Sequence, residues 1–256
     1  MWQILKKGSL TVLGLRHIPQ VRPGDNLGRM IVTAANRQGV QLRNNDVVVV
    51  AQKIVSKAEG RFVSLGDVKP SAKAKRIAGA MKKDPRHVEV ILRETKRVVR
   101  RRGAHLIVET RHGLVCANAG VDKSNVEGQG VVTLLPRDAD GSARRMRKQI
   151  RERTGKVVSV IVSDTFGRPW RLGQTNVAIG LSGMRPWIDY RGTRDMFHYA
   201  LSVTRMAVAD ELAGAAELVM NKVDGIPVAI IRGYPRPRAR GSARQLVRPA
   251  RQDLFR

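Results

Sequence analysis

The chain has 256 residues, of which 42% are hydrophobic and 4% aromatic, and its 48 Lys and Arg against 21 Asp and Glu give a formal net charge of +27. No apolar run approaches the ~20 residues that cross a bilayer, and a single cysteine, Cys116, excludes an internal disulfide and fits a cytoplasmic location. This length allows one large domain or two closely associated ones, and the positive charge favours anionic partners such as nucleic acid, anionic lipid, or phosphorylated and carboxylated small molecules.

The first quarter of the chain alternates predicted strands and helices. The stretch MWQILKKGSLTVLGL is predicted to be a first strand and not a signal peptide, because charges interrupt its apolar run. Asp25 is predicted to cap the amphipathic helix that follows. The β-branched run VVVVAQKIV at residues 47–55 is typical of a buried strand, and residues 57–61 are expected to form a loop.

Two helices and a hairpin are predicted next. PSAKAKRIAGAMKK is one helix, and DPRHVEVILRETKRVVRR is a second, with Asp84 as its N-cap and Pro85 at its first position. We expect Val98 and Val99 to extend the buried stripe of this second helix. HLIVETRHGLVCANAG predicts a hairpin that turns at residues 111–113.

The second half predicts a mixed sheet with further helices. A helix capped by Asp140 or Ser142 is expected to stop at Gly155. The apolar strand KVVSVIVSDT follows, then a strand QTNVAIGLSGM, a helix ending near Met220, and a last strand after DGIP. Residues 234–256 are basic and rich in Pro and Gly. They predict a poorly ordered tail, either solvated without a partner or in contact with RNA or membrane.

Two carboxylates stand at predicted strand ends, Asp122 in CANAGVDKSNV and Asp164 in VSDTFGRPWR. Mg²⁺ and Mn²⁺ take oxygen ligands and usually only one or two protein carboxylates. Asp122 and Asp164, joined by the hydroxyl of Thr165, would supply such a site, and Asn125 could donate to a phosphate or a base. The alternative is that both aspartates satisfy turn backbones, which is the commonest role of an aspartate in a turn.

Basic and aromatic side chains near these positions offer further candidates. Lys57 could reach a phosphate as a point charge, or form a surface ion pair with Glu59. Arg168 and Arg171 flank Trp170 and could clamp an anion over the indole, or the loop could simply pack on its own tryptophan. Cys116 lies in an apolar strand and is expected to be a packed thiol.

Five segments together resemble one known family. VVVVAQKIVSKAEGR, GLVCANAGVDKSNV, DADGSARRMRKQI, VSDTFGRPWRLGQTNVAIGLSGM and VDGIPVAIIRG occur in the order and spacing of the coenzyme F420-0:L-glutamate ligases, also called F420-0:γ-glutamyl ligases. The resemblance runs from about Leu10 to Gly233, and the combination of SKAEGR, NAGVDKSN and SDTFGR is specific. It implies a two-lobed, mixed-sheet α+β fold, an intertwined homodimer, a ligase domain at residues 1–233 and the basic tail at 234–256.

The resemblance also implies the reaction. The enzyme would be a GTP-dependent amide ligase that converts the lactyl carboxylate of coenzyme F420-0 to an acyl phosphate. L-Glutamate would then displace the phosphate, with GDP and phosphate as products, and a second glutamate can follow through a γ-link. The family traits include two divalent cations, Mg²⁺ or Mn²⁺, and a requirement for K⁺.

Residue by residue, the resemblance assigns Asp122 and Asp164 to metal-binding carboxylates, with Thr165 beside the second ion, and gives these aspartates and Lys57 the catalytic role. The positions that match nucleotide contacts are Ile18, Pro19, Gln20, Val21, Gln52, Lys53, Lys57, Asn125, Asp224 and Gly225. NKV stands before DGIP where the family often has a Gly-rich, Glu-containing sequence, and Gln52-Lys53 replaces an expected small hydroxyl pair. The nucleotide preference and the second metal contact are therefore open.

Other functions are compatible with the same residues. A related amide ligase could act on a different carboxylate through the same metal site. A basic nucleic-acid-binding protein would show steeply salt-dependent binding, although the chain lacks aromatics interleaved in a basic groove, so nucleic acid is expected only through the tail. A non-catalytic relative that keeps the fold is the third alternative. No membrane partner is expected.

Overall fold

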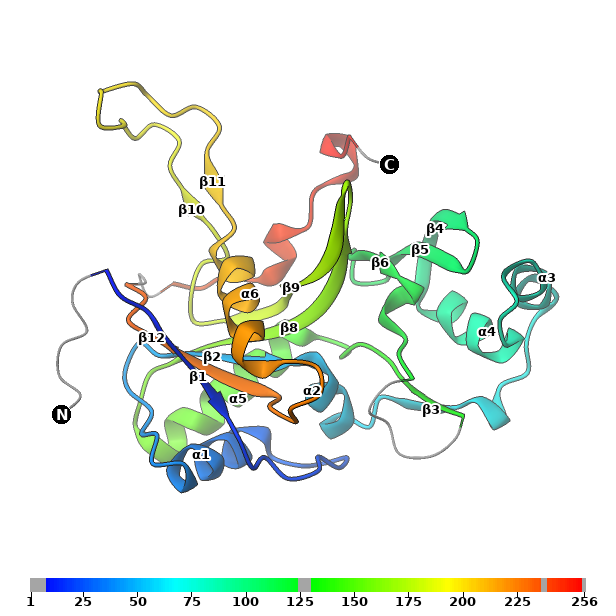
Figure 1. Cartoon of the computed structure of the whole chain (residues 1–256), viewed down its shortest axis with the longest axis horizontal. Coiled ribbons are helices and arrows are strands. Elements are labelled where there is room, and N and C mark those ends of the chain that lie inside the picture. The colour runs from blue at the N-terminus through cyan, green and yellow to red at the C-terminus, as the bar shows by residue number, and fades with distance from the viewer. Residues whose placement is uncertain (1–7, 124–129, 236–238, 255–256) are drawn as a thin grey trace.

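The computed structural model describes residues 8–123, 130–235 and 239–254. In chain order, its α-helices and strands are β1 (Thr11–Leu15), α1 (Leu27–Arg37), β2 (Val47–Ala51), α2 (Gln52–Ala58), β3 (Phe62–Ser64), α3 (Ala72–Met81), α4 (Pro85–Glu94), β4 (Thr95–Arg102), β5 (His105–Thr110), β6 (Val115–Ala117), β7 (Val131–Thr133), α5 (Ala139–Thr154), β8 (Ser159–Arg168), β9 (Arg171–Ser182), β10 (Ile188–Asp189), β11 (Arg205–Met206), α6 (Val208–Met220) and β12 (Val228–Arg232). Helices and mixed sheets share the chain, so the predicted α+β class is confirmed (Figure 1).

The central sheet of the described residues has the strand order β1-β12-β2-β8-β9. Its β2 and β8 run parallel, and its other neighbours are antiparallel. Figure 1 shows α1 and α5 on one side of this sheet and α6 on the other. The sheet is therefore covered on both faces, as a continuous apolar strand requires.

The burial of β2 explains its sequence. Val48 and Val50 pack into a core with α1 and α5, whereas Val47 and Val49 pack into a second core with α6. Successive side chains of a strand point to opposite faces, so a strand with two covered faces needs apolar residues at every position. The predicted buried strand is confirmed for residues 47–51.

The chain is helical at residues that the sequence predicts to be strand and loop. Strand β2 ends at Ala51 and α2 starts at Gln52, so the strand predicted through residue 55 is wrong in its second half. Lys57 lies within this helix and not in a loop. The side chain of Ser56 donates to Gln52 Oε1 one turn earlier at 2.8 Å, a contact that helical spacing allows and an extended strand does not.

The caps of two helices also differ from prediction. Asn26, not Asp25, caps α1 and accepts from Arg29 N, while Asp25 accepts from Arg22 N. The residue before α5 is Asp138, which places Asp140 within the first turn. Gly155 ends α5 in the left-handed conformation, as predicted.

A three-stranded sheet, β4-β5-β6, packs with α3 and α4 on the right in Figure 1. Asp84 caps α4 as predicted, but the helix ends at Glu94 and residues 95–102 form β4 against β5. The predicted helical burial of Val98 is wrong, because its side chain is 38% exposed on β4. The β-branched residues there find a strand partner in β5, which helical periodicity alone could not reveal.

Part of the C-terminal region packs on the central sheet instead of forming the poorly ordered tail that we predict. A short 3₁₀ helix spans Ala243–Leu246, with Ala243 buried in the core that contains α6. The carboxylate of Asp140 accepts from the backbone N–H of Ala243 at 3.0 Å and from the hydroxyl of Ser242. None of the helices that the structure describes has both the length and the apolar character that a bilayer crossing requires.

Candidate functional site

The candidate site lies where the two parallel strands of the central sheet end. Ala51 of β2 is in register with Ser163 of β8, so both carboxyl ends meet at one edge of the sheet. Lys53 is the second residue of α2, just beyond Ala51, and Asp164 follows Ser163 on the longer strand β8. Ligands commonly bind outside the carboxyl ends of parallel strands, because loops of different chain segments converge there.

Asp122 reaches this edge from the region of the three-stranded sheet. Its backbone pairs with Thr133, donating to Thr133 O at 3.1 Å and accepting from Thr133 N at 2.8 Å. Its carboxylate lies 2.6 Å from the ammonium group of Lys53. This half-exposed ion pair joins α2 of the central sheet to a segment 69 positions further along the chain.

Asp164 is the most strongly perturbed carboxyl group at this edge. Its pKa is raised to about 6, mainly by burial, and the negative charge of Asp122 acts in the same direction. The backbone N–H of Thr165, which donates at 2.8 Å, and the positive charges of Lys53 and Lys222 act in the opposite direction. The structure thus brings Asp122 and Asp164 near enough for their charges to interact across Lys53.

A chain of polar contacts continues from Thr165 into α6. The Thr165 hydroxyl donates to Asn176 Oδ1 at 2.6 Å, and Asn176 Nδ2 donates to Glu217 Oε2 at 2.8 Å. The ammonium of Lys222 donates to the Thr165 hydroxyl and lies 2.9 Å from Glu217. We did not predict Asn176, Glu217 or Lys222, although Lys222 belongs to the NKV segment that departs from the family pattern.

Two loops near α2 hold other predicted nucleotide contacts. The N–H of Ala51, the residue before α2, donates at 2.9 Å to the carbonyl of Pro227, which follows closely on the turn at Asp224 and Gly225. Gly24 N donates to Ala58 O at 2.8 Å, which holds the loop after β1 against the other end of α2. Two segments that are distant in sequence therefore border one helix.

The predicted nucleotide residues differ in how accessible their side chains are. Gln52, Lys57 and Val21 are buried, and Val21 packs into the core with α1 and α5. Ile18 is half-buried, while Pro19 and Gln20 are exposed on the same loop. Val21 can contact a ligand only through its backbone. Asn125 lies outside the described residues.

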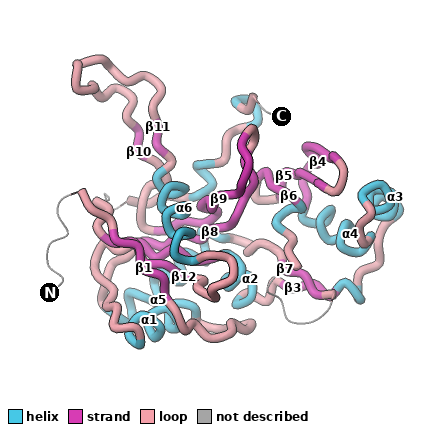
Figure 2. The backbone as a smooth tube through the Cα atoms, in the orientation of Figure 1, coloured by secondary structure: helices cyan, strands magenta, loops and turns pink. Residues whose placement is uncertain are grey.

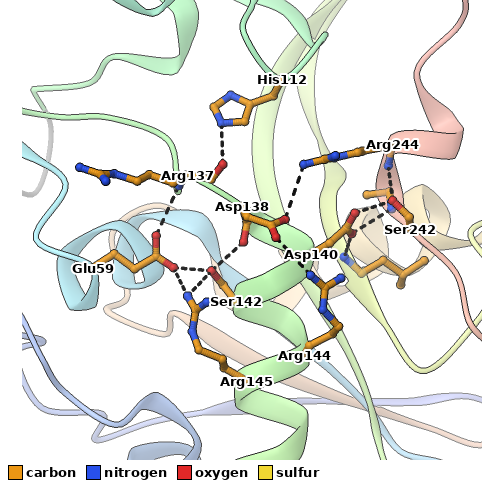
Figure 3. Close-up of polar contacts among 12 residues, drawn as sticks. Glu59, His112, Arg137, Asp138, Asp140, Ser142, Arg144, Arg145, Ser242 and Arg244 are labelled. Atoms are coloured by element: carbon orange, nitrogen blue, oxygen red, sulfur yellow. Dashed lines mark hydrogen bonds and ion pairs between the residues drawn. The ribbon is translucent and has the colours of Figure 1, made fainter.

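The contacts of Glu59 and the exposure of Trp170 bear on two alternatives raised by the sequence, a surface ion pair of Glu59 with Lys57 and a loop packed on its own tryptophan. Glu59 accepts from Ser142 and Arg145 side chains and from Arg137 N, and so ties α2 to the start of α5 (Figure 3). Trp170 is 86% exposed, so packing of its loop on the indole is wrong. Arg168 donates to Leu172 O at 2.6 Å across the same turn.

Cys116 is buried, as predicted. Burial, with the nearby charge of Asp164, raises the pKa of its thiol to about 12. The thiol therefore stays protonated at neutral pH and is no nucleophile.

The oxygen ligands at this edge suit a hard divalent cation. No cluster of three or more His, Cys, Asp or Glu side chains with metal-binding geometry occurs among the described residues. Mg²⁺ needs fewer, since it keeps several waters and takes one or two carboxylates together with substrate phosphates. Asp122, Asp164 and the Thr165 hydroxyl are the side chains here that would hold such an ion, and in this structure the Asp122 carboxylate pairs with the Lys53 ammonium.

Comparison with known proteins shows the family of this chain. Residues 15–233 match the family model described as F420-0:Gamma-glutamyl ligase. The chain is 46% identical over 250 residues to the coenzyme F420:L-glutamate ligase of Methanothermobacter thermautotrophicus. The aligned region covers 96% of this chain and 99% of the relative. The proteins of the same name from Methanopyrus kandleri and Methanocaldococcus jannaschii are 45% and 41% identical, covering 97% and 99% of this chain and 100% and 99% of their own lengths.

Proposed function

Because this chain belongs to the F420-0:γ-glutamyl ligase family, we propose that it joins L-glutamate to the terminal lactyl carboxylate of coenzyme F420-0. The structural observation that carries the proposal is the contact of Lys53 with Asp122, which brings the second carboxylate to the sheet edge that holds Asp164. An anionic acceptor and an anionic nucleotide need such a mixed site, where lysines offset phosphate charge and carboxylates can hold cations.

We propose GTP as the source of activation. A carboxylate is a poor acyl donor, so an oxygen of the lactyl carboxylate would attack the γ-phosphorus, and the bond to the bridging oxygen would break to release GDP. The amine nitrogen of glutamate would then attack the carbonyl carbon of the acyl phosphate. The carbon–oxygen bond to phosphate would break, and the amine would lose a proton.

The lysines of the site would stabilise the negative charge of this transfer. Phosphoryl transfer depends mainly on positioning and charge neutralisation. Lys53 and Lys222 both act electrostatically on Asp164, and Lys57 lies on the same helix as Lys53. Asn176 and Glu217 would position Thr165 through the hydrogen bonds that join them.

Divalent cations are part of the proposal. Asp122, Asp164 and Thr165 would hold one or two Mg²⁺ or Mn²⁺ ions, and these would neutralise the phosphates of the nucleotide. K⁺ would be a further requirement. The chain itself would place the nucleotide against α2, between the loop at residues 18–21 and the turn at residues 224–225, because Gly24 and Pro227, which follow these two segments, are hydrogen-bonded at the two ends of that helix.

We also propose that the protein is a two-lobed, intertwined homodimer. The lobes would be the regions of the central sheet and of the three-stranded sheet, whose buried apolar residues form separate clusters. The arm between β10 and β11 projects from the rest of the chain and is mostly loop (Figure 2). Met196, Phe197, Tyr199 and Val203 are exposed on it, a set of apolar side chains that a second copy would cover.

A light-scattering measurement tests the dimer. The double substitution Phe197→Ser and Tyr199→Ser should halve the molar mass in solution, because it removes apolar contact area from the arm. Leu254→Ser, at another exposed apolar side chain, is the matched control and should keep the mass of the unsubstituted protein. A wild-type chain that is monomeric at all concentrations would contradict this part of the proposal.

A ligation assay tests the reaction. Purified protein with F420-0, L-glutamate, Mn²⁺ and either GTP or ATP should yield, with GTP, a product heavier by one glutamyl unit in the mass spectrum. Asp122→Asn and Asp164→Asn should abolish that product, whereas Asp67→Asn, at an exposed aspartate outside the site, should keep it. Wild-type turnover by Asp122→Asn would exclude the assigned role, and a product formed only with another carboxylate acceptor would show a related ligase.

A further inference from the structure

A cavity lined by arginine side chains lies where β8 begins and β9 ends, at the other end of these strands from Asp164. It has a volume of about 630 Å³ and is lined by Arg144, Arg147, Ser182, Gly183, Arg240 and Gly241. The Nε of Arg147 donates to Val158 O just before β8, and Ser182 is in register with Val160. Asp164 lies four residues further along β8, about 13 Å at the usual rise of a strand, so this cavity is separate from the proposed ligase site.

The charges around this cavity do not balance within the described part of the chain. Arg144 and Arg147 lie three positions apart on α5 and so share one face of the helix. Asp138 offsets Arg144, with 3.1 Å between Oδ2 and Nη2. The described residues provide no carboxylate in an ion pair with Arg147 or Arg240, and none lines the cavity. Among the groups that the structure describes, the guanidinium groups of Arg147 and Arg240 therefore have no counter-charge at this cavity.

The C-terminal segment that carries Arg240 is held in place by contacts of the three residues that follow it, Gly241, Ser242 and Ala243. The buried carboxylate of Asp140 accepts from Leu181 N at 2.7 Å, from Ala243 N and from the Ser242 hydroxyl (Figure 3). At Gly241, a Cβ atom would come within 2.2 Å of Met184 O, so only glycine allows this approach. The wall that presents Arg240 is thus built by specific contacts.

We propose that this cavity binds a phosphate-bearing small molecule with at least two negative charges. Guanidinium groups present planar pairs of N–H donors that match phosphate oxygens, and two uncompensated arginines match a dianion. The Ser182 hydroxyl lies at the same wall as a further polar group. A volume of this size is typical of small-molecule sites and exceeds the needs of a single inorganic ion. This site lies outside the proposed ligase chemistry.

Calorimetric titration with pyrophosphate, without divalent cations and at physiological salt, tests the proposal on the full chain. We expect saturable binding that Arg240→Gln weakens at least tenfold, with an unchanged melting temperature since Arg240 is exposed. Arg251→Gln removes the same charge from the same segment but outside the cavity, and should change the affinity less than twofold. Arg147→Gln, which also loses the contact with Val158 O, should weaken binding as Arg240→Gln does.

Further outcomes separate this site from its alternatives. Lys53→Gln should leave pyrophosphate affinity unchanged, and Arg240→Gln should leave glutamate ligation unchanged. Equal losses in Arg240→Gln and Arg251→Gln would show binding by net charge alone and overturn the proposal. So would a loss confined to Lys53→Gln, which would place the anion in the ligase site. Absence of saturable binding, or citrate binding as tightly as pyrophosphate, would also overturn it.

Discussion

The ammonium group of Lys53 lies 2.6 Å from the carboxylate of Asp122, although Lys53 belongs to α2, Asp122 lies between β6 and β7, and 69 positions separate them. This ion pair joins the start of α2 to the segment between β6 and β7. Its ammonium group also acts on the half-buried Asp164, whose pKa it lowers against the larger effect of desolvation. This ion pair defines the proposed site. One aspartate by itself could not provide for both a phosphorylated substrate and a cation.

Lys53→Gln should lower glutamate ligation at least tenfold, an estimate based on the loss of about 1.4 kcal/mol of charge stabilisation for each factor of ten. The neutral amide cannot offset either carboxylate. The assay is the mass-spectrometric ligation with GTP. Lys75→Gln, at an exposed lysine of α3, should keep wild-type turnover. Equal activities of the two variants would remove Lys53 from the site.

Thr165→Val should lower both stability and activity. Valine keeps the shape of threonine but removes the hydroxyl that bonds Asn176 and Lys222, so the buried Asn176 Oδ1 loses its donor. We expect a loss of about 1–2 kcal/mol in the free energy of unfolding. Thr165→Ser restores the hydroxyl and should recover ligation. Failure of serine to rescue activity would contradict a role for the hydroxyl.

Asp46→Asn should destabilise the fold without entering the site. Asp46 is 1% exposed and accepts two hydrogen bonds from Arg232, at 2.9 and 2.8 Å, while Arg43 N also donates to it. The amide would leave the guanidinium without its counter-charge, at a cost of about 3 kcal/mol. Chemical denaturation measures this difference. A loss below ~0.5 kcal/mol in the free energy of unfolding would mean that water solvates the Arg232 guanidinium in place of the carboxylate.

Gly180→Ala should be destabilising because β9 and α5 approach closely at this residue. A Cβ at Gly180 would lie 2.5 Å from the backbone carbonyl of Ala139, which cannot move away easily. We expect a loss of about 2 kcal/mol. Gly79→Ala is the control, since a Cβ there meets nothing within 4 Å and alanine favours a helix by about 1 kcal/mol. Melting temperatures should therefore shift in opposite directions.

His87 should make the protein less stable as the pH falls. Its pKa is lowered to about 4, mainly by burial, with the charges of Lys123 and Lys83 acting in the same direction and those of Asp84 and Asp122 in the opposite one. The unfolded chain binds this proton near pH 6.5 and the folded chain only near 4, so stability is lost as the pH falls between these values. Buried His87 Nε2 has no hydrogen-bond partner among the described groups.

The measurement for His87 is the melting temperature at pH 7.0 and pH 5.0. Wild-type protein should lose stability over this range, and His87→Leu should lose less, because leucine does not titrate. Identical pH dependence of the two proteins would exclude His87 as the source. The comparison uses the difference between variants, so other titrating groups cancel.

The local sequence alone determined several elements. A continuous run of valines can be stable only in a strand that is covered on both faces, so β2 followed from its residues. Asp84 before Pro85, and Gly155 after α5, marked helix ends because caps depend on neighbouring backbone groups. The family followed too, since its motifs are short, ordered and specific.

Only the tertiary structure decided which distant groups meet. Residues 95–102 have helix-compatible spacing but become β4 because β5 supplies hydrogen-bond partners. The C-terminal segment becomes ordered at Ala243 because Asp140 accepts its N–H. The NKV segment gave no sign that Lys222 would contact Thr165. A sequence pattern reports the preferences of adjacent residues, whereas these contacts depend on partners that folding brings together from far along the chain.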